Sequence, residues 1–453
     1  MRNPAEAAKL LAGMRGFDPL TALNELNAWL DAVKGIPSGD EKVRSETLSL
    51  IQEASGAHVS ALIAQFLARP KDKQATRESD WNTLNNYVTG LAGALCASAR
   101  ILLKQSATTS SLQLPGAAGA ARGLHASRIL AKVYLLRYLS VPPKLWQLAY
   151  AVHGDAEKAG CATTPVRMHA AQKTSTTVTQ ELLRMLMLQS SSPEMMPSEH
   201  IEAADRVIEQ LDGEFTLRPR GFADNPFCFN PGSDQPPHRA PGEPPNPNTE
   251  IRYFGAGTGY DALDRLYKQL AMTRTADIKA SGKDIPLHVQ ISAIRHLLVF
   301  WGEALPYSPP ARTPAAGTLQ VIHGYGQIWQ HLSQVRSATE LTLVEDVDAA
   351  AQAPEMWTQR DAGGNELGAE IPQRSSDWAR CGDVVGVTMH GSDECWLGLI
   401  RSMHAGPDHN LHANIFVLSR HPQAVQLRPL IAKDKVNFVS DNAARQFDFK
   451  SVQ

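Results

Sequence analysis

The first half of the chain repeats apolar residues with the three- and four-residue spacing of amphipathic helices. Asp18 can cap a helix and Pro19 can take its first position, so a helix is expected to begin there. Its apolar face would consist of Leu23, Leu26, Trp29 and Leu30. A later run repeats the spacing with Ile201, Ala204, Val207, Ile208 and Leu211. The pattern predicts an α-helical bundle over residues 1–212.

Proline interrupts this pattern over residues 213–250, with seven prolines between Pro231 and Pro247. Because proline lacks a backbone N–H and restricts the residue before it, we predict an extended linker here. Residues 251–312 return to helical spacing and predict a helical connector. The run from Gly255 to Gly259 lacks the third glycine of a dinucleotide fingerprint and the Gly-Lys-Ser/Thr of a P-loop. It predicts a structural turn, with a phosphate site as the alternative.

Beyond Gly317 the apolar period shortens to two residues, which is typical of β-strands. The alternating sets are Leu319 and Val321; Leu367, Ala369 and Ile371; Val385, Val387 and Met389; Trp396, Gly398 and Ile400; and Ala413, Ile415 and Val417. Turn signals rich in Gly, Asp and Asn separate them. Such short strands predict a small antiparallel β-barrel over residues 313–453. The predicted fold class is α+β multidomain, with an all-α helical N-terminal region followed by this barrel.

Charge and cysteine content narrow the classes of function. The 44 Lys and Arg against 46 Asp and Glu give a net charge of −2, too balanced to hold a nucleic-acid polymer. The five cysteines form no CxxC pair, as expected in a reducing compartment. The mild apolar run from Val88 to Ala99 is shorter than the roughly twenty residues of a membrane span. We therefore expect a cytoplasmic protein with no membrane insertion.

The strands of the predicted barrel carry a resemblance to a known family. The run Trp357-Thr358-Gln359-Arg360-Asp361-Ala362-Gly363-Gly364-Asn365-Glu366-Leu367-Gly368-Ala369 resembles the signature strand of a PilZ domain. Gly382-Asp383-Val384-Val385-Gly386-Val387 and Trp396-Leu397-Gly398-Leu399-Ile400-Arg401 are similar to the next two strands. The resemblance covers about residues 315–430, and the layout is similar to that of large helical proteobacterial proteins with a PilZ-like C-terminus. It implies a receptor for cyclic di-GMP, which the family binds through RxxxR and D/N-x-S-x-x-G motifs.

The sequence departs from both motifs. Asp361 keeps the first motif position, but Gly363 replaces the serine and Glu366 replaces the glycine. Glu366 adds an anion, and a like charge about 4 Å from a bound anion costs roughly 1 to 4 kcal/mol. Arg312 is the one arginine in the stretch ahead of the barrel, although Arg336 or Arg360 could replace its missing partner in space. Any cyclic di-GMP site implied by the resemblance would contain Arg312, Arg360, Asp361, Gly363 and Asn365.

Enzymatic function is not expected, because no catalytic motif is recognisable and no cofactor is implied. Histidines gather in the barrel region, namely His390, His404, His409, His412 and His421. They leave a metal-dependent hydrolase as an alternative, although no HExxH or cysteine pair is present. The sequence favours a non-enzymatic bacterial regulatory protein, with a degenerate PilZ-like barrel and a helical region that contacts a protein partner. The other alternative is a functional cyclic di-GMP effector of motility, pili or surface behaviour, which the resemblance alone suggests.

Overall fold

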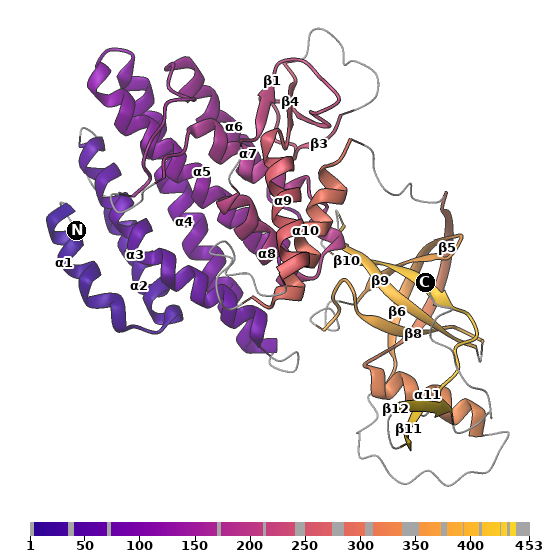
Figure 1. Ribbon diagram of the computed structural model, residues 1–453. Helices are drawn as coiled ribbons and strands as arrows, with labels where there is room; N and C mark the ends of the chain where they lie inside the picture. The colour runs from indigo at the N-terminus through magenta and orange to yellow at the C-terminus, as the bar shows by residue number, and fades with distance from the viewer. Residues whose placement is uncertain are drawn as a thin grey trace. The chain divides into compact units, whose positions relative to one another are not determined.

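The computed structural model divides into two compact units, residues 1–309 and residues 310–453, which are described separately (Figure 1). The first unit is mainly helical and the second contains a closed antiparallel barrel. The predicted α+β multidomain class is therefore confirmed. The structure describes residues 4–34, 40–69, 74–169, 174–211, 214–240, 250–273, 285–303, 311–337, 353–372, 378–392, 394–406, 410–425, 427–432 and 435–440.

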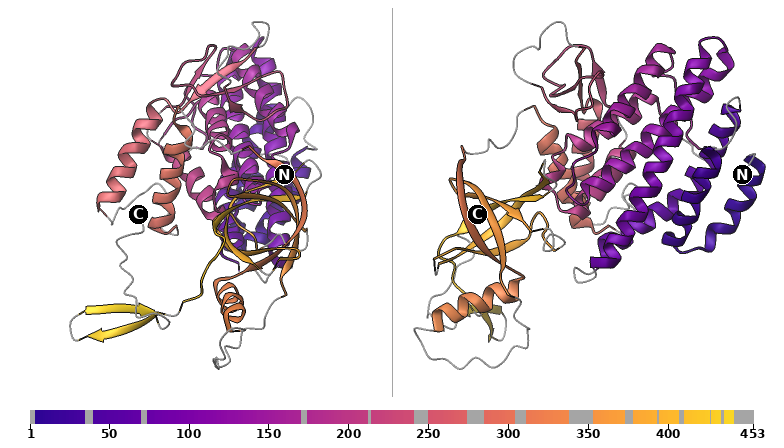
Figure 2. Two further views of the ribbon diagram at one scale, coloured as in Figure 1. Left: turned by 90° about the vertical axis from the view of Figure 1, so that its right-hand side faces the viewer. Right: turned by 180° about the vertical axis from the view of Figure 1, so that it is seen from behind.

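Long helices lie side by side in the first unit (Figures 1 and 2). They are α1 Pro4–Ala12, α2 Pro19–Lys34, α3 Glu41–Ala68, α4 Gln74–Ser106, α5 Gln113–Leu135, α6 Pro143–Lys158, α7 Val178–Gln189 and α8 Ser198–Gln210. The predicted helix at Pro19 is α2, and its apolar residues Leu23, Leu26 and Leu30 are buried. The later predicted run forms α8.

Helix α5 lies at the centre of this bundle and packs most closely against α4. Glycines face the neighbouring helix at the contact, where a Cβ on Gly119 would lie 3.3 Å from Ala99 and one on Gly123 would lie 2.7 Å from Cys96 Sγ. Glycine inside a helix costs about 0.5 to 1 kcal/mol relative to alanine. Here the close approach of two long helices offsets that cost, because it buries both of their apolar faces.

The Ala75–Ser106 part of α4 is long and apolar enough to cross a membrane by length and composition alone. In this structure 56% of its apolar window is buried against the rest of the protein, as in the core helix of a bundle.

Residues 214–240 differ from the predicted linker, because they contribute three short strands to a packed sheet. The sheet has the antiparallel order β1-β4-β2-β3 and contains β1 Thr216–Arg218, β2 Phe227–Phe229, β3 His238–Arg239 and β4 Arg252–Gly255. Aromatic packing outweighs the proline content, since Phe229 stacks on Tyr150 of α6 at 4.8 Å between ring centroids. Prolines 241, 244, 245 and 247 lie outside the described residues.

The glycine-rich run that follows β4 is a packed turn. A Cβ on Gly255 would lie 2.1 Å from the carbonyl oxygen of Asp224, and Gly257 has a positive φ of 52°. Helix α9 Thr258–Thr273 begins directly after it.

Helix α10 Leu287–Trp301 packs against α8 and α9, so the described residues of the predicted connector belong to the first unit. The Trp301 indole N–H donates to Ser191 Oγ at 3.0 Å. Arg239 of β3 donates to the carbonyl oxygens of Phe300, Gly302 and Glu303 and so caps the C-terminus of α10.

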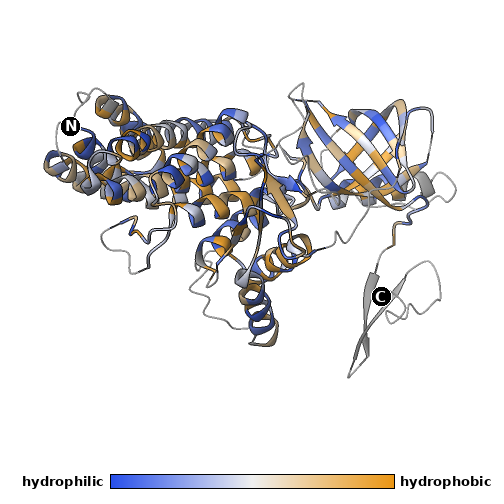
Figure 3. Ribbon diagram, turned by 90° about the horizontal axis from the view of Figure 1, so that it is seen from above, coloured by the Kyte–Doolittle hydropathy of each residue, from blue (hydrophilic) through white to orange (hydrophobic). Residues whose placement is uncertain are grey.

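The second unit is built around a closed barrel with the strand order β10-β7-β6-β5-β8-β9. Its strands are β5 Thr313–His323, β6 Glu355–Gly363, β7 Glu366–Ile371, β8 Val384–Met389, β9 Cys395–Ala405 and β10 Leu411–Ser419. The alternating sets predicted from the sequence all lie in these strands, and Figure 3 shows apolar and polar residues alternating along them. The unit also contains α11 Tyr325–Ser337 and the hairpin of β11 Leu427–Ala432 with β12 Lys435–Ser440.

Two local features shape the wall formed by β6, β7, β9 and β10. Strands β6 and β7 meet through the two-residue turn Gly364–Asn365, in which Gly364 has a positive φ of 58°. Arg360 on β6 and Arg401 on β9 are the extra residues of β-bulges, since their neighbours pair and they do not. A bulge redirects a side chain, and both redirected side chains here are arginines.

We predict that Gly123→Ala destabilises the first unit by about 1 to 3 kcal/mol, because the new methyl group would overlap Cys96. The matched control is Gly93→Ala on the facing helix α4, where an added Cβ meets no atom within 4 Å. That change should stabilise the unit by about 0.5 to 1 kcal/mol. Chemical denaturation measures both, and an equal effect of the two substitutions would contradict the tight α4–α5 contact.

Candidate functional site

The residues singled out from the sequence lie mainly on the outer wall of the barrel. Leu367, Ala369 and Ile371 of β7 are buried inside it. Since side chains alternate along a strand, Glu366 and Gly368 face outward. A Cβ on Gly368 would lie 2.4 Å from Asp361 Oδ1, so the Asp361 carboxylate from β6 lies over this glycine on the same outer face.

Arg312, immediately before β5, reaches this outer face. Its guanidinium donates to Asp361 Oδ1 at 3.2 Å, to the Glu366 carboxylate and to Asn414 Oδ1 of β10. The resemblance implies that Arg312 and Asp361 belong to one site, and in the structure their side chains are in contact. It is joined by Glu366, which is only 4% exposed although it faces outward.

Arg401 supplies a second guanidinium at the same place, which the sequence analysis did not identify. Its Nη1 donates to Glu366 Oε1 at 2.9 Å, and its guanidinium lies 5.6 Å from the centroid of the Phe416 ring. The alternation Trp396, Gly398, Ile400 is the signal that places Arg401 on the outside of the barrel. The missing information was that β9 and β7 flank the same strand, β10.

The other predicted site residues have different roles. Arg360 pairs with Glu370, and Asn365 lies in the hairpin turn, where its carbonyl oxygen accepts from the Val417 N–H at 2.7 Å. A Cβ on Gly363 would lie 2.4 Å from the Ala311 carbonyl oxygen, so the serine of the family motif does not fit here. The side chain of Arg336 lies outside the part that the structure describes.

The charges of this outer-wall cluster cancel. Arg312 and Arg401 contribute two positive charges, and Asp361 and Glu366 contribute two negative charges. Arginine holds carboxylates and phosphates with the same planar set of donors. An anion from solution can therefore bind here only in competition with the carboxylates that are already present.

Two barrel histidines stack on each other beside this cluster. The rings of His404 on β9 and His412 on β10 lie 5.5 Å apart between centroids. Burial, together with the neighbouring His412 and Arg312, lowers the pKa of His404. Among the residues that the structure describes, no group of three or more His, Cys, Asp or Glu is arranged to hold a metal ion. His409, which the hydrolase alternative includes, lies outside those residues.

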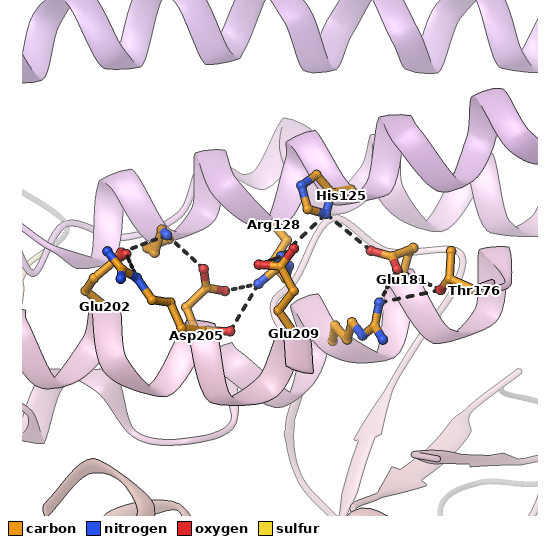
Figure 4. A network of polar contacts seen from close by, with 10 residues as sticks. His125, Arg128, Thr176, Glu181, Glu202, Asp205 and Glu209 are labelled. Atoms are coloured by element: carbon orange, nitrogen blue, oxygen red, sulfur yellow. Dashed lines mark hydrogen bonds and ion pairs between the residues drawn. The ribbon is translucent and has the colours of Figure 1, made fainter. Parts of the chain in front are cut away.

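A second charged cluster lies inside the helical unit, between α5, α7 and α8 (Figure 4). Arg128 of α5 is fully buried and pairs with Asp205 and Glu209 of α8. One turn further along α5, Lys132 Nζ lies 2.7 Å from Glu202 and 2.8 Å from Asp205. The spacing of three and four residues on both helices brings these charges face to face.

Helix α7 extends the cluster through Glu181. Its carboxylate accepts from Thr176 Oγ1 at 2.7 Å, pairs with Arg184 and lies 3.6 Å from His125 Nδ1. Burial by itself raises the pKa of Glu181. The hydrogen bond with His125 and the charges of Arg184 and Arg128 outweigh this effect and lower the pKa to about 2. An adjoining cavity of about 320 Å³ is lined by α3, α4, α5 and α8.

We predict that acid weakens the helical unit through Glu181. In the folded state the pKa of this carboxyl is depressed from its ordinary value of 4.5 to about 2. The ionised carboxylate therefore stabilises the folded state at pH values above 4.5, and this stabilisation is lost as the pH falls toward 2. The loss is on the order of 3 kcal/mol. It is measurable by denaturation at several pH values.

The variant Glu181→Gln should be less stable at pH 7, because the partly buried Arg184 loses its partner, and its stability should depend less on pH. The control is Glu25→Gln, at an exposed position of α2. If Glu181→Gln kept the pH slope of the unaltered protein, this explanation would be wrong.

Comparison with known proteins concerns the helical region rather than the barrel. Residues 5–220 match the family model described as "Cyclic-di-GMP receptor FimW, N-terminal domain". A search of curated proteins and a search of solved structures found no match. The matched range contains α1 to α8 and the whole buried cluster of Figure 4. The resemblance to PilZ domains lies in the barrel, outside the range that this family model matches. The helical region of this chain is therefore similar to the N-terminal domain of the cyclic-di-GMP receptor FimW.

Proposed function

We propose that this chain is a non-enzymatic regulatory protein that binds cyclic di-GMP through its C-terminal barrel. The observation that carries the proposal is the match of residues 5–220 to the N-terminal domain of a cyclic-di-GMP receptor. The remaining chain contains the closed barrel, which resembles a PilZ domain in sequence and has two arginines on its outer wall.

The outer-wall cluster offers the chemical groups that cyclic di-GMP requires. The ligand has two phosphodiester anions and two guanine bases. Arg312 and Arg401 are each less than one third exposed, so they can hold a phosphate in a partly desolvated place. A carboxylate such as Asp361 can accept the two N–H donors on the edge of guanine. Arginine planes and the ring of Phe416 provide surfaces on which a base can stack.

The bound ligand would act by changing the segment ahead of β5. Arg312 lies in that segment, and Ala311 beside it packs against Gly363 of the hairpin. A ligand that takes Arg312 away from Asp361 and Glu366 would shift this segment relative to the barrel wall. The proposed consequence is altered contact with a protein partner in the cytoplasm, in which the helical region takes part.

A second candidate function is a barrel that only binds other proteins. The observation in its favour is that Arg312 is already neutralised by two carboxylates and hydrogen-bonded to Asn414. The two functions differ in one result, namely saturable binding of the nucleotide by the whole chain.

We predict that the full chain binds cyclic di-GMP in a calorimetric titration and that Arg312→Ala weakens binding by about ten- to a hundredfold. The reason is that a hydrogen bond to a charged group contributes about 1.5 to 3 kcal/mol, and each 1.4 kcal/mol corresponds to a factor of ten. The control is Arg380→Ala, which removes the same charge from the turn before β8.

The control variant should bind like the unaltered protein. Absence of binding by the unaltered chain would reject the receptor function and leave the protein-binding barrel. Equal weakening by Arg312→Ala and Arg380→Ala would place the ligand elsewhere.

A further inference from the structure

We propose that Glu366 is an internal competitor for the ligand's phosphate and that Arg401 is the second cation of the binding site. This inference rests on the proposed function, because it names the residues that would set the affinity of the same site. The carboxylate of Glu366 lies between two guanidinium groups, where one anion contacts both. A phosphodiester offers the same two acceptor oxygens and the same negative charge.

The Glu366 carboxylate lies in contact with both arginines. Each oxygen of Glu366 has its own arginine, since Oε2 accepts from Arg312 and Oε1 accepts from Arg401 at 2.9 Å. Glu366 faces outward on β7 but is 4% exposed, which places the two arginine side chains over it. A carboxylate that is removed from water needs charged hydrogen-bonding partners, and the two guanidinium groups supply them here.

The two arginines come from separate segments of the barrel unit. Arg312 comes from the segment before β5, and Arg401 comes from a bulge of β9, so they reach Glu366 from different parts of the barrel. Their side chains are 22% and 27% exposed. Asn414, which accepts from Arg312, in turn donates to Ser402 Oγ at 2.7 Å and so holds the arrangement at β10. The pair of cations is therefore already assembled in this structure, with a carboxylate in contact with both.

The charge of Glu366 would determine how tightly this cluster binds an anionic ligand. With Glu366 charged, the cluster of two arginines and two carboxylates is neutral, and a ligand must displace a carboxylate from both guanidiniums. With a neutral residue at 366, the cluster would carry one positive charge, and the competing anion would be gone. Removing a like charge at about 4 Å increases the affinity for an anion by at least about fivefold.

The two departures from the family motif then differ in kind. Gly363 cannot be restored to serine without moving the Ala311 carbonyl oxygen, which would lie 2.4 Å from the new Cβ. The Glu366 carboxylate contacts the arginines through its two oxygens, and glutamine has nearly the same shape, so this replacement changes the charge without requiring the backbone to move. Position 366 is thus the one at which affinity can be adjusted.

The test is a calorimetric titration with cyclic di-GMP at one fixed salt concentration, on the full chain. The variants are Glu366→Gln, Arg401→Ala and Glu366→Gln combined with Arg401→Ala. The matched control is Glu370→Gln on the same strand and the same face, where the carboxylate pairs with Arg360 and Asn410 instead. Thermal unfolding of each variant shows that the barrel is folded before its titration is interpreted.

We expect Glu366→Gln to bind at least about fivefold more tightly than the unaltered chain, and Glu370→Gln to bind like it. Arg401→Ala should weaken binding at least about tenfold because the second cation is lost. The single variant is compared with the unaltered chain, and the combined variant is compared with Glu366→Gln. Arg401→Ala keeps the inference testable if Glu366→Gln does not fold.

Each outcome separates this inference from the receptor function. Binding only after Glu366→Gln would support the competitor role and reject the function of the unaltered chain as a receptor. Binding by the unaltered chain that Glu366→Gln leaves unchanged, or that Glu370→Gln increases equally, would overturn the competitor role and keep the receptor function. Undiminished binding by Arg401→Ala would remove Arg401 from the site. Absence of binding by all of these proteins would overturn both proposals.

Discussion

The requirement that a charge removed from water must have a partner governs both units of this protein. In the helical unit, Arg128 is fully buried and its charge is balanced by carboxylates of α8. On the barrel, Glu366 is almost fully covered and is held by two arginines. The first cluster joins α5 to α8 through Arg128 and Lys132, and joins α5 to α7 through His125 and Glu181. The second is the cluster through which we propose that the barrel binds an anion from solution.

The same pairing supports a proposed function of the barrel that the motif alone does not explain. Compared with the family motifs, Glu366 replaces a glycine, and Arg312 lacks the second arginine of RxxxR. In space, Arg401 restores the missing cation, and Glu366 contacts both guanidiniums. Residues 5–220 independently match the N-terminal domain of the cyclic-di-GMP receptor FimW. We propose that these features together form a receptor whose affinity is lowered by its own carboxylate.

Local pattern predicted the elements well, whereas contacts between distant segments were not predictable from one sequence. The period-two sets lie in the barrel strands, and the helical spacing at Pro19 marks α2, because burial of one face fixes the period. The strands within residues 214–240 were not predicted, because the prolines there indicated a linker. The stacking of Phe229 on Tyr150 is a contact between distant segments that the local pattern does not contain. The resemblance assigned Arg312 and Asp361 to one site but did not indicate Arg401, because the strand order and the bulge that place Arg401 depend on the closed barrel.

A crystal structure of the full chain with cyclic di-GMP tests the central claim most directly. The account predicts phosphate oxygens on the guanidinium groups of Arg312 and Arg401, with the Glu366 carboxylate turned away from both. A bound ligand elsewhere on the chain, with Glu366 still joining the two arginines as it does here, would contradict it.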